Sequence, residues 1–590
     1  MTSPRQTPND SAPIEAPQQD SNRSDSTPTS ATLESGVGPH SNVSMNDSNG
    51  TEPTKAEKPF SIYTKREKWY VVGMAALAGL YSPLASSVYF PAIPTMAIAF
   101  GKSIELINLT VTMYMVFQGI SPMLWGGLAD RFGRRPVYLT CLLLLLLSSI
   151  GLALVPTNAY WLLMVLRCFQ AAGAASMIAL GAGVISDIAT PGERGGFMGL
   201  FSLGPMVGAG VISDIATPGE RGGFMGLFSL GPMIGPCIGP IIGGLLSGGL
   251  GWRSMFWFQA IATGVMLVFM VLTFPETLRA IVGDGSRRPQ KWNRTPVPIL
   301  GRKVPKVTTG GDQAVFTAPR RGANPLQIFR VFTQPDILLV LISTGIVYSL
   351  FYSVNTTTSP LFLSAYPYLT QSTVGLCFIP YGVGGALGSV VIGRVLDYDW
   401  RKMEQRVASN DAPASKRVEG GGNRAEHEMH TTTHDRDSRK EKTTATKLDK
   451  QDLPIEHTRL KRVPILFLIV IGGSLGYGWS VQQKAHIAVP LVLQFIVGLS
   501  SMSIMTINQT ILVDMYPAQG SSIIASNNFV RCLLGAISLS IQDLLINAIN
   551  PGWTYVLFCG ICLLTVPLFI IEWRYGPMWR KKRATAAKPQ

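Results

Sequence analysis

Long apolar runs recur along most of this 590-residue chain, and short polar segments separate them. Runs of about 20 apolar residues cross the hydrocarbon core of a bilayer as helices, so the pattern predicts an all-α membrane protein. The expected spans of the first half are 69–92, 105–128, 137–156, 160–188, 224–247 and 254–274. Those of the second half are 336–358, 372–395, 463–483, 486–513, 522–546 and 554–573. Six spans on each side of a polar segment predict two matched bundles.

Polar segments divide the chain into five expected regions. The N-terminal stretch is rich in Ser, Thr, Asn and Pro and nearly lacks aromatic residues, so it cannot bury a core. The expected order is a disordered cytoplasmic tail at 1–66, a six-helix bundle at 67–274, a cytoplasmic central loop at 275–332, a second bundle at 333–573 and a cytoplasmic tail at 574–590. The second bundle also contains a long polar loop at 397–462.

Basic residues collect in alternate loops and predict the orientation of the spans. The chain has a net charge of +15, although only 14% of its residues are charged. Arginines follow the second span, and arginines and lysines occur throughout the central segment and after the twelfth span, whereas the loops that alternate with these hold almost none. Basic loops stay on the cytoplasmic side. Both termini are therefore expected on the cytoplasmic side of what we expect to be the plasma membrane. Lipid rather than nucleic acid is the expected partner of the positive charge.

The most densely charged short loop is the stretch 126–136 (GGLADRFGRRP), between the second and third spans. Charges near the centre of a bilayer cost about 2.5 to 3.5 kcal/mol each, so this stretch must lie at one face of the membrane. The residues expected to form an inner gate are Gly126, Asp130, Arg131, Gly133, Arg134 and Arg135. A weak second copy at 393–397 (GRVLD) occupies the equivalent place in the second half and would help them to latch that gate.

Two polar clusters interrupt the apolar runs. Arg167 and Gln170 lie in the fourth span, one turn apart on a similar helix face. Asn527, Asn528 and Arg531 lie in the eleventh span, where positions 527 and 531 share a face. A buried arginine in a membrane needs polar partners and typically marks a transport pathway. We expect the clusters to face each other across a central cavity; structural hydrogen bonding is the alternative role for these side chains.

The fifth span carries closely spaced glycines and prolines in the stretch 235–244 (GPCIGPIIGG). Small residues four apart allow tight contact between helices, and prolines kink the helix. We therefore expect a packed seam that rocks, formed by Gly235, Gly239, Pro240, Gly243 and Gly244.

An exact internal repeat complicates this first half, because residues 181–206 recur unchanged at 208–233. Repeat families diverge around a pattern, so an identical copy is not an architectural repeat. The hybrid stretch 197–216 would make a poor thirteenth span, since it contains Asp214 and many small residues. Either the copy is a recent duplication or an error in the gene sequence, or it forms an excursion on the inner face beside the bundle.

Groups suited to catalysis or metal binding do not form a set in this sequence. Asp543 lies toward the outer end of its span, and Asp187 and Asp514 lie at inner ends, so no proton carrier is identified. The seven cysteines form no paired motif, and the histidines of the loop 397–462 occur in low-complexity polar sequence. We expect no enzyme, no metal and no cofactor.

These motifs resemble those of the major facilitator superfamily, and within it the fungal twelve-span drug:proton antiporters. The matching stretches are 126–136 for the inner-loop signature, 167–173 for the fourth-span motif and 235–244 for the fifth-span antiporter motif. The stretches 275–286, 453–460 and 525–535 resemble the quinidine-resistance subgroup. The resemblance implies the major facilitator fold and export of small organic compounds, such as drugs, toxins or secondary metabolites, by proton antiport with alternating access. It also implies that Arg167 acts in proton coupling or substrate contact.

Two other functions fit the same residues. A cavity with both Arg167 and Arg531 would suit an exporter of organic anions such as carboxylic acids. A non-transporting membrane sensor that signals through the loop 397–462 is the third possibility. For all three functions we expect a monomer.

Overall fold

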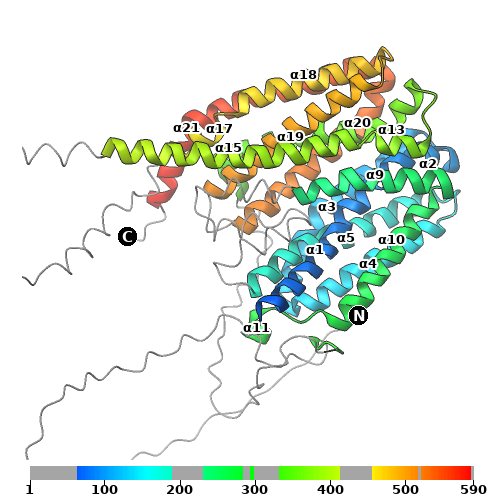
Figure 1. The fold of residues 1–590 in the computed structure, drawn as a ribbon, viewed down its shortest axis with the longest axis horizontal. Coiled ribbons are helices and arrows are strands. Elements are labelled where there is room, and N and C mark those ends of the chain that lie inside the picture. Colours follow the sequence, from blue (N-terminus) through cyan, green and yellow to red (C-terminus); the bar gives the residue numbers. More distant parts are fainter. Residues whose placement is uncertain are drawn as a thin grey trace, which may run out of the picture. The chain divides into compact units, whose positions relative to one another are not determined.

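A computed structural model of the chain describes residues 63–188, 230–283, 293–297, 331–411, 455–515 and 520–586. The described elements are helical throughout (Figure 1). The expected disordered tail lies outside the described residues except for its last four positions. The second copy of the internal repeat also lies mostly outside them, as does most of the central loop.

The described part of the first half consists of six long helices and three short helical segments. They are α1 (Lys65–Ser87), η1 (Phe90–Ala92), α2 (Ile93–Phe100), α3 (Ile104–Phe132), α4 (Arg134–Leu154), α5 (Tyr160–Ile188), α9 (Leu230–Leu250), α10 (Arg253–Thr273) and α11 (Arg279–Val282). The chain starts α1 with a capping box: the Thr64 hydroxyl accepts from the Glu67 backbone N–H, and the Glu67 carboxylate accepts from the Thr64 N–H at 2.8 Å. Gly101, with φ of 58°, ends α2 in the left-handed conformation.

The second half repeats this arrangement. Its elements are η3 (Val331–Thr333), α13 (Pro335–Ala365), α14 (Gln371–Leu376), α15 (Ile379–Asp411), α17 (Ile455–Leu460), α18 (Val463–Gln482), α19 (Ala488–Met515), α20 (Gly520–Leu563) and α21 (Thr565–Ala586). The long element α20 is broken at Asn550, whose φ of 67° and ψ of 160° are not helical. Pro551 follows the break and cannot continue the preceding helix without a kink.

Apolar helices in the described part of the chain coincide with all twelve predicted spans. Ten such stretches lie in the described part of the chain, together with a shorter apolar helix at Cys237–Leu250. The last stretch, Ile523–Arg583, covers 61 residues and contains the break at Asn550, so it supplies two crossings. The protein is therefore an all-helical, multi-pass membrane protein, as the hydrophobic pattern predicts.

Several helices extend beyond the predicted spans. Helix α15 continues to Asp411, well past the expected end at 395, and α21 continues to Ala586. The segment Ile455–Leu460, predicted to lie in a polar loop, is the helix α17. Hydropathy marks only the part of a helix that lies in hydrocarbon. The extension of α15 is polar and contains no glycine or proline, so the helix can continue through it. The second half consequently projects helix ends beyond its predicted spans.

Helix packing links the two halves along two seams. Within the first half α3 and α4 pack on α5, and within the second half α15 and α18 pack on α19. Between the halves, α3 packs along α20, and α9 packs against α14 and α15. We call the end of the bundle near Asp130–Arg135 the basic end, and the opposite end, near Gly101 and Asn550, the far end.

The short helix α17 packs against three helices of the second half, α15, α19 and α21, at the basic end. The Arg459 Nε atom lies 2.8 Å from the Asp514 Oδ2 atom of α19, and both side chains are buried. The Arg459 guanidinium also lies 4.6 Å from the ring centre of Trp400 on α15. From the same helix, Glu456 pairs with Arg580 of α21 at 2.9 Å. These contacts hold α17 against the rest of the second half.

Replacing Asp514 by Asn should lower the stability of the protein clearly. Arg459 would lose its buried carboxylate, and losing one partner of a buried ion pair costs about 3 to 5 kcal/mol. Asp130→Asn is the matched control, because the Asp130 side chain is 53% exposed in its pair with Arg134 and such pairs contribute about 0 to 1 kcal/mol. The measurement is the thermal midpoint of the detergent-purified protein. Equal midpoints for the two variants would contradict a structural role for the Arg459 pair.

Candidate functional site

Arg167 lies at the centre of a buried polar chain that crosses the first half. Its side chain is fully buried on α5, and its Nη1 atom donates to the Oε1 atom of Gln170 at 2.6 Å. The Gln170 Nε2 atom donates in turn to the Oε1 atom of Gln259 on α10 at 2.6 Å. A hydrogen bond thus joins the predicted pair Arg167 and Gln170. Gln259, which no sequence motif marked, extends this chain of hydrogen bonds to α10.

Two tyrosine rings hold the positive charge of Arg167. The guanidinium carbon lies 4.1 Å from the ring centre of Tyr89 and 4.3 Å from that of Tyr114. The Tyr89 hydroxyl group is itself hydrogen-bonded to Thr110 at 2.7 Å. Aromatic faces attract a cation by about 2 kcal/mol or more when the cation is shielded from water. The arginine is therefore stabilised without a carboxylate partner among the described residues.

Part of the Arg167 guanidinium has no hydrogen-bond partner. Its Nε and Nη2 atoms are buried and make no hydrogen bond within the described chain. Arginine carries five N–H donors in a planar fork that matches a carboxylate or phosphate. The side chain is thus held firmly in place while two of its donor nitrogens stay available to another group.

The second polar cluster lies on α20. The Arg531 Nη2 atom donates to the Asn528 Oδ1 atom at 2.7 Å, and the guanidinium carbon lies 4.5 Å from the ring centre of Tyr348 on α13. Asn528 also donates to the backbone carbonyl of Gln118 on α3 at 3.2 Å. Asn527 is buried, but its Oδ1 atom has no hydrogen-bond partner in the described part of the chain. Asn528, one turn before the arginine, is the residue that positions Arg531.

Helix α3 connects the two arginine clusters. Tyr114 contacts Arg167, and Gln118, one turn further along α3, binds Asn528 through its carbonyl oxygen. The next residue, Gly119, leaves room for Cys532, whose Cβ atom would lie 3.1 Å from a Cβ at position 119. A movement of α3 against α20 therefore changes the surroundings of both arginines.

The predicted inner-gate motif forms the turn between α3 and α4. Gly133 adopts φ of 109° and ψ of 156°, a backbone conformation that other residues rarely adopt. The Arg134 Nη2 atom pairs with Asp130 at 2.8 Å, and its Nε atom pairs with Asp187 of α5 at 3.1 Å. Arg135 is buried and donates from Nε to the Phe274 carbonyl at 2.9 Å. These contacts tie the motif to other helices of the first half.

Glu276, which no sequence motif assigned a role, completes this turn. Its carboxylate accepts hydrogen bonds from the backbone N–H groups of Arg134 at 2.9 Å and Arg135 at 3.2 Å. These are the first residues of α4, where free N–H groups and the helix dipole favour an anion. The expected latch between this motif and the stretch 393–397 stays a prediction. A Cβ atom at Gly126 would have no atom within 4 Å, and Arg131 lies over the Phe132 ring at 5.5 Å.

The glycines of the stretch 235–244 place α9 between the two halves. A Cβ atom at Gly239 would lie 2.6 Å from the Cβ atom of Ser87 on α1, and one at Gly243 would overlap the carbonyl oxygen of Val88. On another face, a Cβ atom at Gly244 would lie 2.9 Å from the carbonyl oxygen of Gln371, at the start of α14.

Other members of the same stretch make equally close contacts. A Cβ atom at Gly235 would overlap Pro83 of α1, and the Pro240 carbonyl oxygen lies 2.5 Å from the position that a Cβ atom of Gly375 would take. Small residues therefore permit contact with both halves, as expected for a packed seam.

Comparison with known proteins identifies the family. The model of the Major Facilitator Superfamily matches this chain at residues 75–212 and 205–408, two segments that meet inside the duplicated stretch. The chain belongs to this family. It is a transporter of small molecules rather than an enzyme, and it has the fold that its motifs implied.

Several fungal transporters are similar to the chain over most of its length. It is 33% identical to the MFS-type transporter phiD of Fungal sp. (strain ATCC 74256), over 91% of this chain and 73% of the relative. It is 32% identical to Citrate exporter 1 of Aspergillus niger, over 91% of each chain. It is 31% identical to the MFS antiporter QDR1 of Candida albicans, over 87% of this chain and 89% of the relative.

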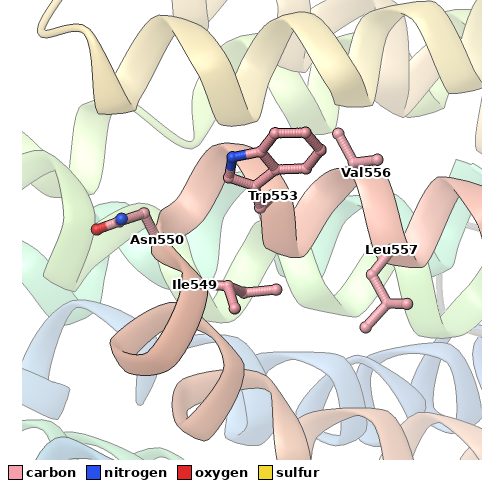
Figure 2. A pocket seen from close by; sticks show the side chains of 5 residues that line it. All are labelled: Ile549, Asn550, Trp553, Val556 and Leu557. Carbon is pink, nitrogen blue, oxygen red and sulfur yellow. The ribbon is translucent and has the colours of Figure 1, made fainter.

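A surface pocket at the far end does not coincide with the arginine clusters. Figure 2 shows its lining at the break of α20, where Ile549, Trp553, Val556 and Leu557 are apolar and Asn550 is the polar member. Arg531 precedes this pocket by five helical turns, about 27 Å along the helix axis. The pocket is therefore separate from the polar interior.

Adding one methyl group to α9 should test the seam. Gly243→Ala should destabilise the protein by about 1 to 3 kcal/mol, the usual cost of overpacking, because the new methyl group meets the Val88 carbonyl. Gly249→Ala on the same helix is the control, since no atom lies within 4 Å of its added Cβ. Thermal midpoints of the two purified variants provide the comparison. A Gly243→Ala protein as stable as the control would rule out close packing of α9 on α1.

Proposed function

We propose that this protein exports a small organic compound across the plasma membrane in exchange for protons, with both termini in the cytoplasm. The alternation between inward and outward access would come from rocking of the two halves. The chain's similarity to an MFS antiporter supports this proposal, as do the subgroup motifs at 275–286, 453–460 and 525–535. We place the chain in the quinidine-resistance-like group. Its relatives are named as transporters and exporters, which favours transport over a sensor.

The observation that carries the proposal is the environment of Arg167. A structural arginine inside a bundle has its charge and donors satisfied by the chain, as Arg459 shows with Asp514. Arg167 instead is held by two aromatic faces and a glutamine, with two donor nitrogens left over. An intramembrane charge of this kind marks a substrate or proton pathway.

The contacts between the halves fit one state of an alternating cycle. Among the described residues, hydrogen bonds between the halves link α3 with α20 and η1 with α13, and they lie between the middle of these helices and the far end. Phe90 of η1 also contacts Tyr352 and Phe378 of the second half, with ring centres 6.2 and 6.5 Å apart. Together they support a state that is sealed at the far end.

Reconstituted liposomes test the proton coupling. The purified chain should move a substrate from a panel of drugs, toxins and secondary metabolites only when a pH gradient is imposed, and a protonophore should abolish the movement. Transport that is equally fast without the gradient would contradict antiport while leaving the family membership intact.

Arg167→Lys should reduce this transport by about tenfold or more, because lysine keeps the charge but loses the planar fork that fits between two rings. Arg253→Lys is a matched control. Arg253 also lies over an aromatic ring, that of Trp252 at 4.3 Å, and donates to a backbone carbonyl, but it lies at the far end of α10. Equal transport losses in both variants would argue against a special role for Arg167.

An organic anion is the second candidate substrate. The two unpartnered nitrogens of Arg167 offer a paired contact to a carboxylate, and a citrate exporter is among the relatives. In the same liposomes, inhibition by citrate-like tricarboxylates and not by hydrophobic cations would favour this class. Inhibition by hydrophobic cations alone would exclude it.

A further inference from the structure

A buried carboxylate lies in the seam between the halves, near the far end. Asp543 of α20 is 9% exposed, and its Oδ2 atom accepts a hydrogen bond of 2.5 Å from the Nδ2 atom of Asn108 on α3. One turn toward the far end, Asn547 of α20 donates to Glu105 of α3. One turn toward the middle, Ser540 donates to Thr112 at 3.5 Å. We call these three pairs the far-end contact.

The charge of Asp543 is not balanced by a cation. No lysine, arginine or histidine of the described chain forms an ion pair with it, and the charged group that faces it from α3 is another acid, Glu105. On its own helix the preceding residue, Gln542, binds α13 through the Ser353 carbonyl, which fixes the position of this turn. Burying an ionised carboxylate without a cation is costly, so closing the far-end contact around a charged Asp543 is unfavourable.

Asn108 has a hydrogen-bonding group that a protonated acid can use. Its Nδ2 atom donates to Asp543, but its Oδ1 atom is buried and has no hydrogen-bond partner among the described residues. An ionised carboxylate only accepts hydrogen bonds, whereas a protonated one also carries a donor. Uptake of one proton from water at the far end would therefore remove the charge of Asp543 and add a donor beside an acceptor that lacks one.

We propose that Asp543 is the proton-binding group of the far-end contact, and that α3 and α20 close on each other when it is protonated. When the carboxylate loses its proton, the contact opens and the group returns to water. In an antiporter, a proton that enters from outside would bind Asp543 and thereby close the far end of the protein to the outside. The inference rests on the proposed function only for that last step, because the opening itself does not depend on substrate.

The test measures the separation of α3 and α20 without any transport. Spin labels are attached at Leu106→Cys and Ile549→Cys, two partly exposed positions at the far ends of these helices. Cys237, the one native cysteine that is not buried among the described residues, is replaced by Ala in every variant. Pulsed electron–electron spectroscopy on the full-length protein in lipid nanodiscs gives the distance distribution at pH 5 and at pH 8.

The expected result is a population with longer distances that is about tenfold larger at pH 8 than at pH 5. Asp543→Asn, which keeps the shape but stays neutral, should show the short distance at both pH values. Glu105→Gln is the matched control and should keep the pH response, because Glu105 is only partly buried. A pH response that survives in Asp543→Asn, or is lost in Glu105→Gln alone, would overturn the proposal. So would the absence of any response in the parent protein.

A second variant should favour the open contact, whereas Asp543→Asn should favour the closed one. Asn108→Asp places two carboxyl groups face to face, and like charges in contact disfavour each other. At pH 8 the longer distances should then dominate, and acidification should restore the short distance. Failure of this variant to open would count against the proposal even if Asp543→Asn did not fold. The distance measurement needs no substrate, so loss of transport and loss of the pH response can be told apart.

Discussion

A charged side chain can persist inside a membrane bundle only where the protein itself replaces the water that it has lost. This chain does so in different ways. Arg459 is neutralised by Asp514, a buried ion pair that locks one arrangement of the second half. Arg167 is held by the faces of Tyr89 and Tyr114, which attract the charge but leave donor nitrogens unused. The first solution suits a structural joint, and the second suits a group that meets another molecule.

The same distinction separates contacts within a half from contacts between halves. Within each half, arginine–carboxylate pairs such as Arg134 with Asp187 and Arg580 with Glu456 join neighbouring helices. Between the halves, the contacts described above include hydrogen bonds from uncharged donors, close glycine packing and aromatic rings. Individual hydrogen bonds contribute about 0.5 to 1.5 kcal/mol, far less than the cost of splitting a buried ion pair. The halves can therefore separate while each keeps its internal structure.

Hydrophobic patterning predicted the helical fold well, because a bilayer imposes long apolar helices on any chain that crosses it. It also marked Arg167 and Gln170, since charged and polar residues stand out in an apolar run. It could not identify Gln259, because one amide side chain in α10 carries no sign of its partner until Gln170 is seen beside it. Nor could it choose Asn528 over Asn527 as the partner of Arg531. The two asparagines are adjacent, and the sequence does not show which of their side chains points toward the arginine. Such partners are set by tertiary packing.

The position of Asp543 shows why an acid at the edge of a span deserves the same weight as one at its centre. Judged by depth alone, Asp543 lies too near the far end to carry protons through the middle of the protein. Its partner Asn108 is 435 residues away in the sequence, on the opposite half, so no local pattern reveals the pair. A group that controls access needs only to lie where two rigid bodies meet, because there a change of one charge acts on the whole contact. Depth in the membrane and control of the cycle are therefore separate properties.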